Sequence, residues 1–187
     1  MTKTRSLMLA FILLAFSGLT GCDYNRMVES RTGVERAWAD VDAQLQRRND
    51  LIPNLVQTVK GYAAHEKQVL VAVTEARAKV AGAGTVDQKI AASNELSGAL
   101  SRLLVVAERY PDLKADATFI RLSDELAGTE NRIAVARTRY NGAVETYNAT
   151  IAKFPGLITA KLFKFAPKPF FESAPGAKEA PKVEFGG

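Results

Sequence analysis

The sequence predicts an all-α protein, an antiparallel up-and-down four-helix bundle with long helices. Three observations lead to this prediction. After residue 22, apolar or small residues recur at spacings of three and four, as on one face of a helix, and no segment shows convincing strand alternation. The breaks between these stretches are short, which makes successive helices antiparallel neighbours. The length of 187 residues and the hydrophobic content of 47% fit one domain of ordinary size.

The first 21 residues are predicted to be a lipoprotein signal peptide. Lys3 and Arg5 form a basic start, and residues 7–21 are apolar or small throughout. This run ends in the segment LTGC at residues 19–22, which resembles the bacterial lipobox, in which cleavage precedes a cysteine that then carries lipid. Since Cys22 is the only cysteine and stands at the required place, it is the expected lipidation site. Several acyl chains would make a durable anchor.

The alternative for this terminus is an uncleaved transmembrane helix from Leu7 to Asn25, about 19 residues long. The lipobox is favoured. Asp23, directly after the cysteine, resembles the inner-membrane retention signal of enterobacterial lipoproteins. We therefore expect a lipid-anchored protein of the bacterial cell envelope, held at the inner membrane and facing the periplasm.

The first two helices are expected to meet at a turn over residues 49–53. Pro53 pushes Ile52 away from helical torsions. The second helix then runs from about Pro53 to Val80 and ends in a glycine-rich turn at residues 82–84. A single long helix kinked at Pro53 is the alternative, because the apolar spacing continues in phase across the proline. The expected inward positions are Val34, Trp38, Val41 and Leu45, then Val56, Val59, Ala63, Leu70, Val73 and Val80.

The third helix is expected to begin at Thr85, which forms a capping box with Gln88, and to end before Pro111. The fourth starts within residues 112–116 and runs to Lys153, with a length near 58 Å if it has about 39 residues. The expected inward positions are Leu96, Leu100, Leu103 and Ala107, then Phe119, Leu122, Leu126, Ile133, Ala136, Tyr140, Val144, Tyr147 and Ile151.

Several sequence blocks between about residues 30 and 172 are distinctive, among them WADVDAQL at 38–45, RRNDLIPNLV at 47–56 and LAGTENRIA at 126–134. Together they resemble the LemA family of bacterial envelope proteins. The resemblance implies an antiparallel helical bundle at residues 22–153, tethered to a membrane and without a settled biochemical function. It singles out as signature positions Trp38, Arg48, Asp50, Pro53, Glu66, Arg77, Glu130, Asn131, Arg132, Arg137, Tyr140, Asn141 and Tyr147.

Composition and motifs argue against catalysis. One Cys and one His cannot build a Cys/His zinc site, and the nucleophile-elbow, P-loop and zincin motifs are absent from the sequence. His65 is expected to be an exposed helix residue, and the glycines at 82 and 84 a turn. Nucleic-acid binding is not expected, because the chain has no basic helix face. We expect no catalytic residue, no cofactor and no metal.

Two charged residues occupy positions where the helical spacing places core residues: Arg48 and Glu66. A buried charge is costly unless it is paired. We therefore expect Arg48 to pair with Glu130, with Asn131 as a further partner, and so to fix the register of the bundle. The alternative is that all of these residues are surface charges.

The segment 154–172 differs from the rest in composition. Between Lys153 and Phe171 the chain holds four Lys, five of its nine Phe and no acidic residue. Such a segment suits a membrane interface; alternatively, its rings cap the open end of the bundle. Four antiparallel helices would return it to the start of the first helix, whereas the long-helix alternative would send it to the far end. Candidate interface residues are Lys161, Phe163, Lys164, Phe165, Phe170 and Phe171.

Residues 173–187, rich in Pro, Ala, Gly and Lys, are predicted to be a flexible tail. The whole is expected to act as a non-catalytic interaction or adaptor module. It would attach to the membrane through lipidated Cys22 and bind an unidentified envelope protein. The alternatives are an accessory subunit of an envelope enzyme, such as a membrane protease, and a structural spacer.

Overall fold

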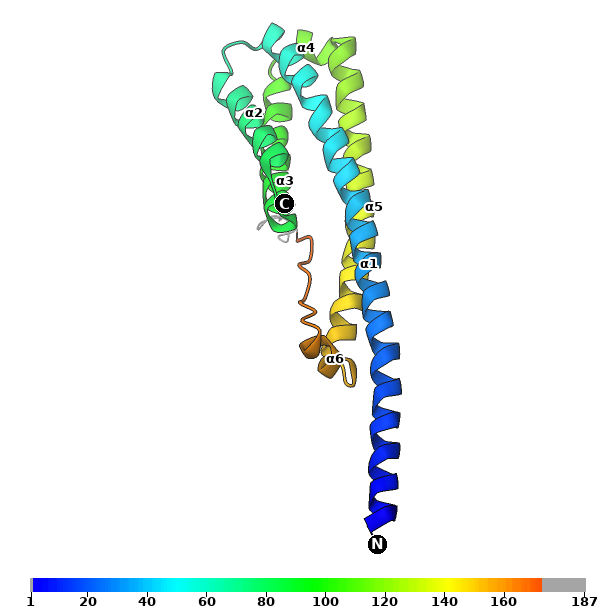
Figure 1. The fold of residues 1–187 in the computed structure, drawn as a ribbon. Coiled ribbons are helices and arrows are strands. Elements are labelled where there is room, and N and C mark those ends of the chain that lie inside the picture. The colour runs from blue at the N-terminus through cyan, green and yellow to red at the C-terminus, as the bar shows by residue number, and fades with distance from the viewer. Residues whose placement is uncertain (1, 173–187) are drawn as a thin grey trace, which may run out of the picture. The chain divides into compact units, whose positions relative to one another are not determined.

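The computed structural model describes the backbone of residues 2–172 and the side chains of residues 23–172. Regular structure in this part is helical: α1 (Thr2–Tyr62), α2 (Lys67–Gly82), α3 (Val86–Ala107), α4 (Pro111–Ala115), α5 (Ala117–Ala152) and α6 (Gly156–Leu162) (Figure 1). The all-α prediction is confirmed, with six helices in the described chain where four were expected. The side chains of the predicted signal peptide and of Cys22, and the predicted tail, lie outside the described residues.

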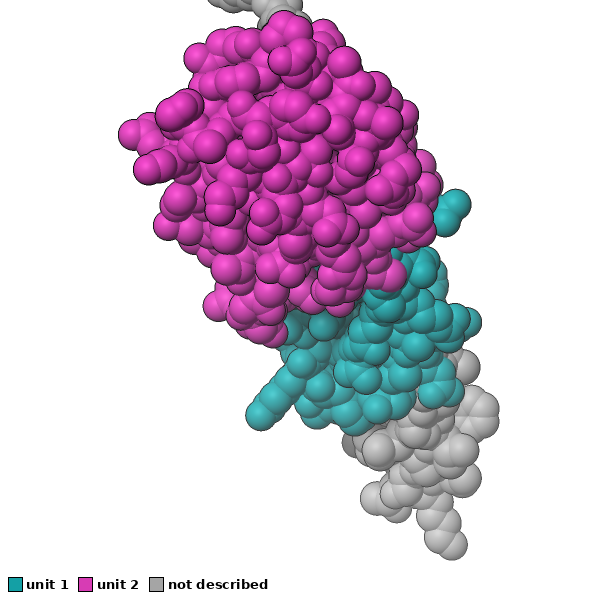
Figure 2. Space-filling model, turned by 90° about the horizontal axis from the view of Figure 1, so that it is seen from above, with its two compact units in different colours: residues 1–40, 136–170 teal, residues 41–135, 171–187 magenta. Residues whose placement is uncertain are grey.

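The contacts divide the chain into two compact units (Figure 2). Unit 1 comprises residues 1–40 and 136–170, and unit 2 comprises residues 41–135 and 171–187. The long helices α1 and α5 contribute a segment to each unit. The helices α2, α3 and α4 belong to unit 2, and α6 belongs to unit 1.

Unit 2 is built around a core that is almost entirely aliphatic. Its inward positions agree with the spacing predicted from the sequence, except that Val56 is only half-buried. Removal of this much apolar surface from water is the main favourable contribution to its folding. The core residues are Ile52, Leu55, Val59, Ala63, Leu70, Val73, Ala76, Val80, Ala92, Leu96, Ala99, Leu100, Leu103, Ala107, Leu113, Phe119, Leu122 and Leu126.

The predicted turn at residues 49–53 is wrong, because α1 continues through Pro53. The alternative of a single helix across the proline is correct. The in-phase residues Leu45, Ile52 and Leu55 are all buried, so the apolar face of α1 points into the core on both sides of the proline. The tertiary packing of an amphipathic face therefore outweighs the local preference of proline.

The first break falls further along the chain, between Tyr62 and Lys67. His65 is exposed, as expected, but it lies in this turn rather than in a helix. The glycine-rich end of α2 is confirmed, and so is the capping box of α3, in which Thr85 Oγ1 accepts from the Gln88 N–H at 3.2 Å. The short helix α4 precedes α5, whose start near Asp116 agrees with the prediction.

Unit 1 combines aromatic and aliphatic side chains. Trp38 of α1 meets Tyr140 of α5 edge-on, with ring centroids 5.3 Å apart. At the start of α6, a Cβ on Gly156 would lie 2.5 Å from the Thr150 carbonyl oxygen and 2.9 Å from Met27 Cε, so only glycine fits there. The buried apolar residues of unit 1 are Met27, Val34, Ala136, Tyr140, Val144, Tyr147, Ile151 and Ala160.

Candidate functional site

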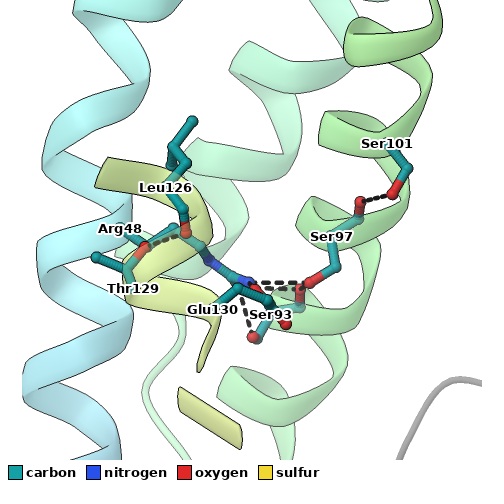
Figure 3. A network of polar contacts seen from close by, with 7 residues as sticks. All are labelled: Arg48, Ser93, Ser97, Ser101, Leu126, Thr129 and Glu130. Carbon is teal, nitrogen blue, oxygen red and sulfur yellow. Dashed lines mark hydrogen bonds and ion pairs between the residues drawn. The ribbon is translucent and has the colours of Figure 1, made fainter. Parts of the chain in front are cut away.

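In the interior of unit 2, a network of polar contacts surrounds Arg48 (Figure 3). The Arg48 side chain is 2% exposed. Its Nη1 donates to Glu130 Oε2 at 2.8 Å and to Ser97 Oγ at 2.9 Å. Its Nη2 donates to Ser93 Oγ at 2.7 Å and to the Ser93 carbonyl oxygen at 3.2 Å. The predicted pairing of Arg48 with Glu130 is therefore present, and the network joins α1, α3 and α5.

The serines of this network come from consecutive turns of α3. Ser97 Oγ donates to the Ser93 carbonyl at 3.1 Å, and Ser101 Oγ donates to the Ser97 carbonyl at 3.0 Å. Small hydroxyl side chains let α3 approach the guanidinium closely while still offering acceptors. The carboxylate that pairs with Arg48 in this network, that of Glu130, is half exposed, at 52%. Loss of one member of such a pair costs more than the pair itself contributes.

A second polar contact explains how α1 continues through Pro53. A proline has no N–H, so in a helix the carbonyl four residues earlier, that of Asn49, lacks its usual donor. Arg77 of α2 supplies one, because its Nε donates to the Asn49 carbonyl oxygen at 3.2 Å. The Asn49 residue is itself buried, with 2% exposure. Arg77 therefore links α2 to the point in α1 that proline weakens.

A cavity of about 300 Å³ lies beside the Arg48 network, within unit 2. Its polar lining includes Ser123, whose hydroxyl oxygen is buried without a hydrogen-bond partner among the described residues. Buried hydroxyls normally have a partner, so this one is suited to a group supplied from outside. The full lining is Arg48, Leu55, Ser97, Leu100, Ser101, Leu104, Ser123, Leu126, Ala127 and Glu130.

The other charged residue expected in the core, Glu66, lies in the turn before α2 and is 22% exposed. It accepts from Arg109 Nη2 at 2.8 Å and from the Tyr110 hydroxyl at 3.1 Å. Burial, together with this hydrogen bond, raises the pKa of Tyr110. Glu66 therefore has the partner that its position requires, at the end of α3.

In unit 1, three side chains of α5 hold the extended segment 166–170. The Tyr140 hydroxyl donates to the Pro169 carbonyl at 2.8 Å, and the Tyr147 hydroxyl donates to the Ala166 carbonyl at 2.9 Å. Asn148 makes two bonds to the backbone of Lys168, one donated and one accepted, both at 2.9 Å. This segment has no helix of its own, so these bonds satisfy backbone groups that would otherwise lack partners.

The aromatic residues of the C-terminal segment have two different environments. Tyr24 contacts Phe163 and Phe165, with ring centroids 4.8 and 5.8 Å apart, so this segment returns to the early part of α1 within unit 1. The far-end position expected of the long-helix alternative is wrong, because the chain has a further break between Tyr62 and Lys67. Phe165 also faces Arg31, whose Cζ lies 5.5 Å from the ring centroid. Of the candidate interface residues, Phe171 is buried and Phe165 is half-buried. The exposed ones are Lys161, Phe163, Lys164 and Phe170.

A comparison with protein families decides the classification. A sequence profile described as the LemA family matches residues 37–185, which is most of the chain. The protein belongs to the LemA family. Among the curated relatives of this LemA protein, Magnetosome protein MamQ 2 of Paramagnetospirillum magneticum is 27% identical over 87% of this chain and 70% of its own length. Protein LemA of Metamycoplasma hominis is 24% identical, over 70% of this chain and 60% of its own length.

The LemA signature positions fall into distinct groups in the structure. Arg48 meets Glu130 in one, Pro53 and Arg77 share Asn49 in another, and Trp38, Tyr140 and Tyr147 lie in unit 1. Arg137 and Asn141 also lie in unit 1, where they are half-buried on α5, whereas Asp50, Asn131 and Arg132 are exposed. The expectation that Asn131 joins Arg48 is wrong, because the serines of α3 occupy that place.

Sequence reasoning on this LemA protein missed Ser93, Ser97, Asn49 and Asn148 as contributors. A signal existed for the serines, since they recur every four residues along a buried helix face. The role of Asn49 follows only once α1 is known to pass through the proline. Among the side chains of residues 23–172, no three His, Cys, Asp or Glu residues are grouped to hold a metal ion. In the same range, no helix is long and apolar enough to cross a membrane.

Proposed function

We propose that this LemA protein is a membrane-anchored envelope lipoprotein whose unit 2 holds a partner protein near the membrane, without catalysis of its own. The observation that carries the proposal is the cavity beside Arg48. Its apolar lining is partly open to solvent, since Leu104 is 43% exposed, and its lining includes Ser123, whose buried hydroxyl has no hydrogen-bond partner among the described residues. An apolar recess with a few fixed polar groups is typical of recognition sites.

The groups at the cavity favour binding over reaction. A catalytic base or nucleophile needs a reactive, suitably poised protonation state. Here the carboxylate of Glu130 accepts from Arg48, and the Ser97 hydroxyl both accepts from Arg48 and donates to Ser93. These groups are engaged in holding the helices together, so they are suited to a fixed recognition surface.

We further propose that the helical segments of unit 2 form the antiparallel up-and-down bundle expected of the family. The core residues of α1, α2, α3 and α5 support this arrangement, since each helix turns an apolar face into one shared cluster. Such a bundle would give the cavity rigid walls, which lowers the entropic cost of binding a partner.

The anchor in this proposal is lipidated Cys22 at the inner membrane, with the described part of the protein on the periplasmic side. The lipobox sequence at residues 19–22 supports it. A Cys22→Ser chain should lose metabolic labelling by palmitate, because its only cysteine has been replaced. A variant that is still labelled with palmitate would contradict the assignment of Cys22.

Partner binding is tested by photocrosslinking in intact cells, with p-benzoylphenylalanine in place of Leu104 at the cavity. The matched control carries it in place of Val71, an exposed aliphatic residue of unit 2 at 53% exposure that does not line the cavity. We expect one dominant envelope protein crosslinked at 104 and not at 71. No crosslink at either position would favour a structural spacer, and equal crosslinks at both would remove the cavity from the proposal.

A further inference from the structure

Unit 1 exposes an unusual set of apolar side chains around α6, here called the α6 face. Monomeric proteins rarely expose clustered apolar residues without a use for them. Phe154 is 81% exposed, Leu162 69% and Phe163 51%, and Ile158 and Leu157 are 46% and 40% exposed. All five lie within ten residues of one another in sequence, at the end of α5 and along α6.

The charges on the α6 face have one sign. Lys153, Lys161 and Lys164 are exposed, and the segment from 153 to 171 contains no acidic residue. At the Phe154 end of the α6 face, a hollow lined by Phe154 also contains Asp23 and Glu145, and Arg26 and Lys153 line the same hollow. The α6 face is therefore apolar at its centre and basic at its edges, which complements a negatively charged surface.

The position of the α6 face within unit 1 connects it to the proposed anchor. Phe163 packs on Tyr24 with ring centroids 4.8 Å apart. Tyr24 follows Cys22 by two residues in the same helix, α1, which corresponds to about 3 Å along the helix axis. A lipid attached at Cys22 would bring this end of unit 1 to the bilayer surface.

We propose that the α6 face lies on an anionic bilayer, with Phe154, Leu162 and Phe163 inserted at the boundary between headgroups and acyl chains. The lysines would then meet the phosphates. This proposal rests on the membrane attachment in the proposed function, and adds the surface that fixes how unit 1 meets the lipid. A lipid occupant is favoured over a protein, because lysine is depleted in protein–protein interfaces whereas aromatic and basic residues together suit a membrane surface.

The test places an environment-sensitive fluorophore on the α6 face of the full chain. In the chain purified from membranes the Cys22 sulfur carries lipid, so the cysteine introduced by Leu162→Cys is the only free thiol and can be labelled with a nitrobenzoxadiazole dye. Val105→Cys on α3 is the matched control, because Val105 and Leu162 are both 69% exposed. Each chain is mixed with vesicles of phosphatidylglycerol and phosphatidylcholine in equal parts, or of phosphatidylcholine alone, and floated before fluorescence is read.

We expect the probe at 162 to brighten severalfold with phosphatidylglycerol vesicles and to be quenched by spin-labelled lipid, while the probe at 105 stays accessible to aqueous iodide. Replacing Lys161 and Lys164 by Gln should weaken this signal, since each lysine near an anionic surface contributes about fivefold in binding. A chain that floats while its 162 probe stays open to iodide overturns this inference alone. A chain that does not float overturns membrane attachment as well.

Protection of the 162 probe from iodide without quenching by lipid would mean that protein, such as a second copy of the chain, covers the α6 face. That result also overturns the inference. Brightening that is equal on both vesicle types would remove the role of the lysines and overturn the anionic preference.

Discussion

Each of the two units of this LemA protein is stabilised internally by a different kind of interaction. Unit 2 has a large aliphatic core and the buried guanidinium of Arg48. This guanidinium donates to the Glu130 carboxylate on α5 and to the Ser93 hydroxyl on α3. Among the described side chains, unit 1 has fewer buried ones, and its extended segment is held by hydrogen bonds from Tyr140, Tyr147 and Asn148. The stability of unit 2 should therefore depend on packing and charge balance, and that of the C-terminal segment on individual hydrogen bonds.

The largest loss of stability in unit 2 is expected when the acidic partner of the buried Arg48 is removed. We expect Glu130→Ala to lower the free energy of unfolding by about 3 kcal/mol, because Arg48 stays buried without the Glu130 carboxylate. Arg48→Met should cost less, about 1 kcal/mol, because Glu130 is half exposed and water can solvate it. Denaturant unfolding measures both. A larger loss of unfolding free energy for Arg48→Met than for Glu130→Ala would contradict this prediction.

A matched control for that experiment is the exposed pair of Arg121 and Glu125, in which Arg121 is 64% exposed. Glu125→Ala should change stability by less than about 0.5 kcal/mol, as is usual for surface pairs. A loss equal to that of Glu130→Ala would show that burial of Arg48 is not the cause.

The corresponding change in unit 1 is Asn148→Leu, which removes both bonds to Lys168. We expect a loss of about 2 kcal/mol in the local stability of the segment 166–170, at about 1 kcal/mol for each bond. Amide hydrogen exchange should show faster exchange at Lys168 and its neighbours, while the amides of α3 in unit 2 keep their protection. Equal acceleration in both units would mean that the segment is not held independently.

Within unit 2, Arg77→Met tests the donor that replaces the missing N–H of Pro53. We expect a loss of about 1 kcal/mol, because the Asn49 carbonyl is then buried without its donor. In a Pro53→Ala background, alanine restores a helical N–H, and the same Arg77→Met change should cost much less. A double-mutant cycle measures the difference. Independent, additive effects would sink the idea that Arg77 compensates for the proline.

The smallest expected effect is a dependence on pH at the start of α5. Bonds from the Phe119 N–H and then from the Tyr62 hydroxyl hold the pKa of Asp116 below its ordinary value of 3.8. A carboxyl group with a lowered pKa stabilises the fold at pH values above its ordinary pKa. This stabilisation is lost as the pH falls through the lowered pKa. NMR shifts of Ala117 and Phe119 should therefore show fraying of α5 below about pH 4. An Asp116→Asn chain should lack this transition.

The periodicity of the sequence was enough to predict an all-helical chain and nearly all of the buried positions, because helical burial repeats every three to four residues. It failed at Pro53. The proline removes a hydrogen bond locally, but the compensating donor, Arg77, lies on a different helix and is visible only after folding. The same limit applies to Asn148. Its partner is the backbone of Lys168, and a backbone group is the same whatever the residue type, so the sequence does not indicate this contact.

The Arg48 contact could be predicted in part. A charge on a buried stripe requires a partner, and Glu130 stood beside the apolar face of the fourth predicted helix. Asn131 was the wrong choice of third residue, because adjacent helix positions face different directions. Ser93 and Ser97 lie where they can accept hydrogen bonds from Arg48, but an uncharged serine in the sequence does not indicate a partner for a buried charge.

We propose that unit 1 contacts lipid and that unit 2 binds a protein. It is tested most directly by photocrosslinking the two surfaces in living cells, with p-benzoylphenylalanine in place of Leu162 in one strain and of Leu104 in another. We predict lipid adducts and no discrete protein band from 162, and one dominant envelope protein from 104. The same protein crosslinked at both positions, or lipid adducts from 104, would contradict the claim.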